Sequence, residues 1–266
     1  MRIVKPARMS AAVLFPALLM SAWAHASTYQ QGQLVVGQVE PGVQVWLNGQ
    51  PLPVSNAGLY AFGLGRNAKA NGVITTRRAG VDSEQALSVT KRRYPEQKIN
   101  GLPAKKVTPD PEVGQRISAD NQQIGAVRAS QSQAEWLGSS WIMPVQGRIS
   151  GVYGARRILN GVPKSPHNGV DIAAAAGTAI VAPIAGRVAL VHEDMFYTGK
   201  TLMLDHGLGV TSVYAHMQSI NVHFGQLVQQ GEVLGTVGQT GRATGPHLHW
   251  GVTWQRTHVD PLLLVD

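Results

Sequence analysis

The stretch Thr244-Gly245-Pro246-His247-Leu248-His249-Trp250-Gly251 decides how the C-terminal half of this chain folds and what it holds. Two residues separated by one position on an extended segment point to the same face of a strand, so His247 and His249 present their imidazoles side by side. Upstream, His167 and Asp171 supply another imidazole and a carboxylate four residues apart, just before an apolar-rich run. Together these residues offer nitrogen and oxygen ligands to a metal ion.

Two imidazoles and one carboxylate make the three-ligand set of a catalytic zinc site, in which a fourth tetrahedral position stays open. Structural zinc sites are usually closed by thiolates. The chain has 266 residues and no Cys, so a closed thiolate site is excluded. An open, hydrolytic zinc site is therefore favoured.

Residues 1–26 predict a cleavable signal peptide. Basic residues precede an apolar stretch from about Ala11 to Trp23, and Ala24-His25-Ala26 fits a small-x-small cleavage site. The stretch is shorter than the roughly 20 residues of a spanning helix, and Pro16 interrupts it. No Cys follows it, so we expect no stable membrane anchor. We expect export to the periplasm, with an extracellular location as the alternative.

The formal net charge is +8, and the predicted signal peptide contributes three of these charges through Arg2, Lys5 and Arg8. A basic chain is attracted to anionic polymers such as nucleic acid, a membrane surface or a cell-wall glycopeptide. No basic run is interleaved with aromatic residues. We therefore expect no nucleic-acid partner, although charge alone does not choose among the other two.

Residues 27–92 predict a small β-sandwich-like domain, because short alternating apolar runs recur from Gly32 to about Thr90. Asn48-Gly49 lies between two such runs and is the strongest short hairpin signal, since both turn residues tolerate positive φ. No cluster of chemically active side chains occurs here. We expect this domain to bind, target or shield.

Residues 93–137 predict a linker followed by a helix. The linker is rich in Lys, Arg and Pro, and Asp110-Pro111-Glu112 predicts the helix start with Asp110 as its N-cap. Apolar residues from Val113 to Leu137 fall on one helical face, a stripe that Asp120 and Gln131 interrupt. Residues 138–266 return to strands and glycine turns, so the zinc domain is predicted to be antiparallel β and the chain mainly β.

Three motifs follow one another in this last part: His167-x-x-x-Asp171, Tyr214-Ala215-His216-Met217 and His247-x-His249. Ser150 to Arg156 precedes the first motif, and Gly238-Gln239-Thr240-Gly241 precedes the last. In this order, residues 138–266 resemble the lysostaphin-type zinc metalloendopeptidases, which have the duplicated hybrid motif fold and cleave peptidoglycan peptides.

The resemblance implies that His167, Asp171 and His249 bind one zinc ion, while His216 and His247 flank the hydrolytic water. Imidazoles titrate near neutrality, so His216 and His247 also suit general acid/base work on chemical grounds. Some relatives have lost ligands and act only as amidase activators, whereas this sequence retains every one. The resemblance therefore implies a working endopeptidase with peptidoglycan peptide stems as its partners, and we expect a monomer.

Several alternatives stay open at this level. Tyr153 and Arg156 are candidates for substrate binding, with packing and turn roles as the alternative. A silent peptidoglycan-binding regulator and an exported protease of protein substrates are the rival functions. The first domain and linker are hypothesised either to restrain the enzyme as a lid or to target it to the wall.

Overall fold

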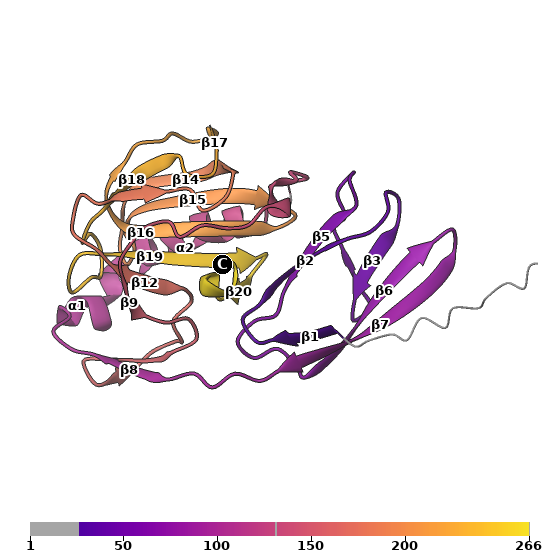
Figure 1. Ribbon diagram of the computed structural model, residues 1–266. Helices are drawn as coiled ribbons and strands as arrows, with labels where there is room; N and C mark the ends of the chain where they lie inside the picture. Colours follow the sequence, from indigo (N-terminus) through magenta and orange to yellow (C-terminus); the bar gives the residue numbers. More distant parts are fainter. Residues whose placement is uncertain (1–26, 131, 266) are drawn as a thin grey trace, which may run out of the picture.

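The computed structural model describes residues 27–130 and 132–265. The predicted signal peptide, residues 1–26, lies outside the described residues. Strands dominate both halves of the described chain, so the prediction of a mainly β protein is confirmed (Figure 1). No helix among the described residues is long and apolar enough to cross a bilayer.

The N-terminal part contains a five-stranded sheet and a separate two-stranded sheet. The sheet has the order β1-β7-β6-β3-β4, and β2 pairs antiparallel with β5. The bounds are β1 Ser27–Gln30, β2 Leu34–Gln38, β3 Gln44–Leu47, β4 Gln50–Leu52, β5 Leu59–Gly63, β6 Asn71–Arg78 and β7 Val81–Thr90. Asn48 and Gly49 join β3 to β4 with φ of 51° and 78°, which confirms the predicted hairpin turn.

The segment predicted as a linker also contains regular structure. Strand β8 (Glu96–Ile99) pairs parallel with β10 (Arg156–Leu159), and a short helix, α1 (Ala104–Val107), follows it. Buried Leu102, Val107 and Leu159 form a small apolar cluster. These few apolar side chains hold an otherwise basic segment against the C-terminal half, a packing that its composition does not show.

A 3₁₀ turn, Pro111–Val113, leads into helix α2 (Gly114–Arg128), which packs against the central sheet. Asp110 caps neither element with its side chain and instead pairs with Lys105 at 3.1 Å. The helix ends at Arg128, so the predicted stripe to Leu137 does not lie on one helix. Asp120, predicted to interrupt that stripe, is the buried residue of α2, and its carboxylate accepts a hydrogen bond from the Phe196 amide at 2.7 Å.

The C-terminal half is built on one ten-stranded sheet. Its main path is β17-β14-β15-β16-β19-β12-β9, with β13, β18 and β20 attached beside it. Its strands are β9 Arg148–Gly151, β12 Val170–Ala173, β13 Ala179–Val181, β14 Gly186–Met195, β15 Gly199–Gly207, β16 Val210–Ile220, β17 Leu227–Val228, β18 Val233–Val237, β19 His247–Trp254 and β20 Thr257–Val259; β11 (Val162–Pro163) pairs with β10. Short 3₁₀ turns cover Trp136–Gly138 and Pro261–Leu263.

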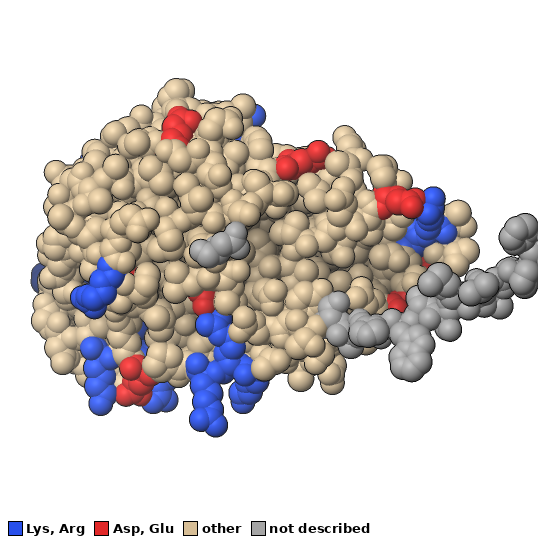
Figure 2. Space-filling view, in the orientation of Figure 1, with Lys and Arg blue, Asp and Glu red and all other residues tan. Residues whose placement is uncertain are grey.

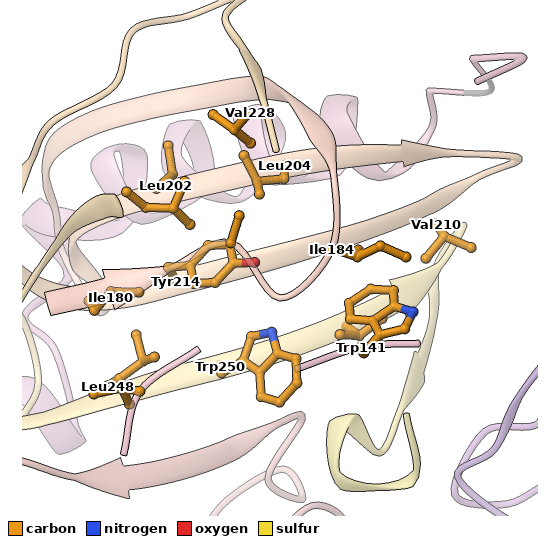
Figure 3. Close-up of a cluster of buried hydrophobic side chains, with 14 of the residues drawn as sticks. Trp141, Ile180, Ile184, Leu202, Leu204, Val210, Tyr214, Val228, Leu248 and Trp250 are labelled. Carbon is orange, nitrogen blue, oxygen red and sulfur yellow. The ribbon is translucent and has the colours of Figure 1, made fainter. Parts of the chain in front are cut away.

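The core of this half gathers large apolar side chains from the central strands (Figure 3). Strands β15 and β16 are buried along almost their whole length, as expected for strands covered on both faces. Tyr214 of β16 and Trp250 of β19 are directly opposite each other in the ladder and fully buried. This packing fixes β16 against β19, the two strands that carry three of the predicted site histidines.

The N-terminal part contacts the far end of β19. A side chain at Gly63 of β5 would meet Trp254, the last residue of β19, at 3.1 Å. Arg92, just after β7, donates to the buried carboxylate of Asp260 at 2.8 Å. His247 begins β19 and Trp254 ends it, so about 23 Å of strand separates the predicted site from this contact.

Candidate active site

Two neighbouring strands bring the predicted metal ligands together. In the antiparallel pair β12–β19, Asp171 lies directly opposite His249, and such pairs share a face. His167 lies three residues before β12 begins. The Asp171 Oδ1 atom lies 3.0 Å from His167 Nε2 and 2.8 Å from His249 Nδ1, and the two imidazole nitrogens are 3.0 Å apart. One carboxylate oxygen and two ring nitrogens thus converge on one point.

This donor set fits a divalent metal ion. The three ligand atoms lie within 4.8 Å of one another, and tetrahedral zinc is bound by such nitrogen and oxygen atoms at about 2.0–2.2 Å. The Nδ1 atom of His167 lies 3.1 Å from the Val152 carbonyl. A carbonyl only accepts, so Nδ1 carries the hydrogen and Nε2 keeps its lone pair for a ligand.

Burial shapes the charge of this group before any ion binds. Burial lowers the pKa of His167 to about 4, against the opposing pull of the Asp171 carboxylate. Burial alone would raise the pKa of Asp171, but the interactions of its carboxylate with the adjacent imidazoles of His167 and His249 hold that pKa well below its usual range. The site therefore presents a neutral imidazole and a carboxylate, the protonation states that metal ligands require.

His216 occupies a strained position on β16. Its φ is 63°, in the left-handed region that residues other than glycine rarely adopt. Just before it, Ala215 pairs with His249 of β19, and just after it Met217 pairs with Val237 of β18. The backbone turns where β16 changes partners, and such strain is characteristic of functional positions.

The imidazoles of His216 and His247 face each other beside the ligand group. Their ring centres are 4.7 Å apart, and the His216 ring lies 6.3 Å from that of His249. Each Nδ1 atom lies 2.8 Å from a backbone carbonyl, that of Thr240 for His216 and that of Gly245 for His247. Both Nδ1 atoms therefore donate, and both Nε2 atoms are left to exchange protons.

Burial lowers the pKa of His216 to about 3, with repulsion from His247 and His249 acting in the same direction. This imidazole is therefore neutral at physiological pH, and its Nε2 atom keeps a lone pair. Sequence reasoning did not assign a role to Thr240, the residue that orients the ring. Its hydroxyl donates to the Met217 carbonyl at 3.0 Å and accepts from the Lys200 amide at 2.9 Å, so Thr240 is itself fixed on both sides.

A cleft of about 340 Å³ opens over these residues. Asp171, His216 and His247 line it, together with the loop Arg242–Pro246. The segment predicted as a linker forms another part of the wall through Gln97, Ile99 and Leu102. None of residues 27–92 lines the cleft.

Arg157 is a cleft residue that sequence reasoning missed. Its guanidinium pairs with Asp171 Oδ2, on the opposite carboxylate oxygen from the two imidazoles. The sequence pointed instead to its neighbour Arg156. Successive residues of a strand point to opposite faces, so Arg157 faces the cleft while Arg156 pairs with Glu96 outside it. Strand alternation in residues 156–159 was the signal that could have identified Arg157.

The structure does not bring Tyr153 to the cleft either. This side chain is only 2% exposed, and its hydroxyl donates to the His258 carbonyl at 2.8 Å. Its ring packs edge-on against Tyr94 at 6.1 Å. Of the two roles left open by the sequence, packing is the one that this burial favours.

Comparison with known proteins agrees with this geometry. The sequence profile of peptidase family M23 matches residues 165–261, which include all five site residues. A crystal structure of a putative M23 peptidase from Pseudomonas aeruginosa is 32% identical, with a TM-score of 0.68, and the match covers 88% of this chain and 94% of that chain. The chain belongs to peptidase family M23.

The curated relatives match this chain over only part of their own length. The chain is 39% identical over 105 residues to the peptidoglycan DD-endopeptidase ShyA of Vibrio cholerae, covering 39% of this chain and 24% of that relative. It is 33% identical over 156 residues to an uncharacterized metalloprotease of Haemophilus influenzae, covering 55% of this chain and 33% of that relative. The chain thus matches a third or less of the length of these two M23 relatives.

Proposed function

We propose that this protein is an exported, zinc-dependent endopeptidase that hydrolyses peptide cross-links of peptidoglycan in the periplasm. The observation that carries the proposal is the convergence of His167, Asp171 and His249 on one point, with His216 and His247 beside it in an open cleft. When bound, zinc would lower the pKa of water toward about 7 and polarise the scissile carbonyl.

The remaining chemistry falls to the two imidazoles that do not bind the metal. His216, held neutral by burial and aimed by the Thr240 carbonyl, can accept a proton from water at Nε2. His247 presents its own Nε2 across the same gap. As an imidazolium, with hydrogens on both ring nitrogens, it can donate a hydrogen bond from Nε2 to the developing oxyanion or a proton to the leaving amine. Positioned proton transfer of this kind contributes about 10²–10⁴ in rate.

The charge of the surface supports a wall-bound substrate. Lys and Arg side chains gather along the lower edge of the view in Figure 2, where β8 lies in Figure 1. Such a surface attracts an anionic polymer. The relative named as a peptidoglycan DD-endopeptidase supports the same class of substrate.

A silent peptidoglycan-binding regulator is the alternative. Metal analysis and digestion of purified sacculi by the same preparation test the two together. We expect one zinc per chain and release of cross-link-derived muropeptides, identified by mass. Asp171→Ala should lose both the metal and the activity. A zinc-loaded, folded protein that binds sacculi without releasing any product would favour the regulator and overturn the proposal.

A further inference from the structure

Arg148 lies in the same row of the sheet as a proposed catalytic residue. On the adjacent strands β9, β12 and β19, Arg148 is opposite Ala173, and Ala173 is opposite His247. Residues opposite each other in antiparallel strands project to the same face. Strands lie about 4.8 Å apart, so the Arg148 and His247 backbones are separated by roughly 10 Å. Because the side chain of Ala173 is short, it does not fill the space between the Arg148 and His247 side chains.

The cleft is positively charged even before a metal ion binds. Arg148, Arg157 and Arg242 line it, and Asp171 is the acidic residue among the lining residues. Arg157 is already paired with Asp171. Arg242 packs over the Tyr197 ring at 4.4 Å and donates to the Lys106 carbonyl at 3.3 Å, but it has no acidic partner among the described residues.

Arg148 differs from Arg157 and Arg242 because its guanidinium has no partner among the described residues. Its side chain is exposed, and within residues 27–130 and 132–265 it has no hydrogen bond, ion pair or ring contact. A guanidinium carries several donors in a planar fork that matches a carboxylate in bidentate geometry. A free guanidinium at the edge of a reaction cleft is therefore well suited to an anionic group of the substrate.

We infer that Arg148 is a specificity residue that binds a free carboxylate on the peptide, within about one residue of the scissile bond. The row geometry supports this placement, because the long Arg148 side chain can extend over the short Ala173 side chain toward a residue next to a carbonyl that lies near His247. Arg242, which also lines the cleft, adds positive charge. The inference rests on the proposed function and adds a substrate preference: peptides with a free carboxylate next to the scissile bond.

The test uses two soluble cross-linked muropeptides that differ in one group. The residue next to the scissile bond carries a free carboxylate in one peptide and a carboxamide in the other. We expect the wild-type chain to prefer the carboxylate peptide by about tenfold in kcat/KM, the lower end of the effect of a hydrogen bond to a charged group. Arg148→Gln should reduce that preference to less than about twofold, and Arg148→Lys should keep part of it.

Arg256→Gln is the matched control. Arg256 is also an exposed arginine without a partner among the described residues, but it follows the far end of β19 and does not line the cleft. The control variant should retain the full preference. An equal loss in Arg256→Gln would show that overall charge, not a carboxylate site, sets the preference, and would overturn the inference.

A binding measurement separates this inference from the proposed function. In the His216→Ala variant, calorimetry should show that the carboxylate peptide binds more tightly than the carboxamide peptide. In the double variant His216→Ala/Arg148→Gln, the two peptides should bind with equal affinity. Wild-type cleavage of both peptides at equal rates would overturn the role of Arg148 and leave the endopeptidase intact. Preferential binding that depends on Arg148, without turnover by the wild type, would overturn the endopeptidase and support the carboxylate site.

Discussion

Replacing Tyr153 with Phe distinguishes a packing role from a substrate-binding role at this position. The substitution removes one hydroxyl and keeps the ring, which is 2% exposed and packed against Tyr94. What is lost is the 2.8 Å hydrogen bond to the His258 carbonyl of β20. A buried bond of this kind contributes about 1 kcal/mol, and more where the partner is left unsatisfied. We therefore expect a loss of about 1–2 kcal/mol in the free energy of unfolding.

For a domain of 150–250 residues, 1 kcal/mol corresponds to roughly 2–4 °C in Tm, so Tyr153→Phe should lower the Tm by about 2–8 °C. The assay is thermal unfolding followed by circular dichroism at fixed zinc, with kcat and KM measured on a soluble muropeptide at 25 °C. Both kinetic constants should stay within about twofold of wild type, since the hydroxyl is remote from the cleft lining.

Tyr197→Phe is the control for this experiment. Its hydroxyl has no hydrogen-bond partner among the described residues, and its ring would keep the contact with Arg242. We expect little change in Tm for this variant. An unchanged Tm together with a raised KM in Tyr153→Phe would refute the packing role and return Tyr153 to the substrate-binding residues.

Three further outcomes are expected. His216→Ala and His247→Ala should each keep stoichiometric zinc by metal analysis while losing about 10²–10⁴ in turnover; a metal-free His247 variant would move that residue into the ligand set. Burial lowers the pKa of His206 to about 4, so between pH 6.5 and 4 the unfolded chain binds a proton that the folded chain does not, and stability falls as the pH falls. His206→Asn should reduce the slope of unfolding free energy against pH in that window by up to about 1.4 kcal/mol per pH unit, as measured by urea unfolding in EDTA. An unchanged slope would show that the pKa of His206 is not lowered in the folded chain. Asn160 has a φ of 46°, a value that glycine also adopts without strain, so Asn160→Gly removes two hydrogen bonds to the Leu102 backbone without straining the turn. If the linker residues that line the cleft restrain the enzyme, turnover of soluble muropeptides by this variant should rise severalfold. Unchanged turnover would rule out a lid.

The linker, rather than the first domain, is the structural candidate for that restraint. The first domain contacts the Trp254 end of β19, whereas the linker residues Gln97, Ile99 and Leu102 line the cleft itself. A targeting role for residues 27–92 remains compatible with this arrangement. The Asn160→Gly variant tests the linker without removing the strand β8 that pairs with β10.

The sequence by itself determined the β character of the chain and the set of histidines and carboxylate at its centre. The β character follows from local periodicity, and the histidine and carboxylate set follows from the motif spacing and from the family that it resembles. Alternation places His247 and His249 on one face whatever lies next to them, and Asn48-Gly49 makes its turn because both residues tolerate positive φ. The motif order in residues 167–249 then sufficed to identify the family, since the ligand types and spacing are specific.

Only the tertiary structure decided which side chains share the cleft with that centre. Arg148 lies in the row of His247 because β12 sits between β9 and β19 in a fixed register. Thr240 orients His216, and Leu102 forms part of the wall, at sequence separations of 24 residues or more from the side chains that they serve. These contacts depend on strand order and register over long separations, which burial of the whole apolar core selects and which no local pattern of residues encodes.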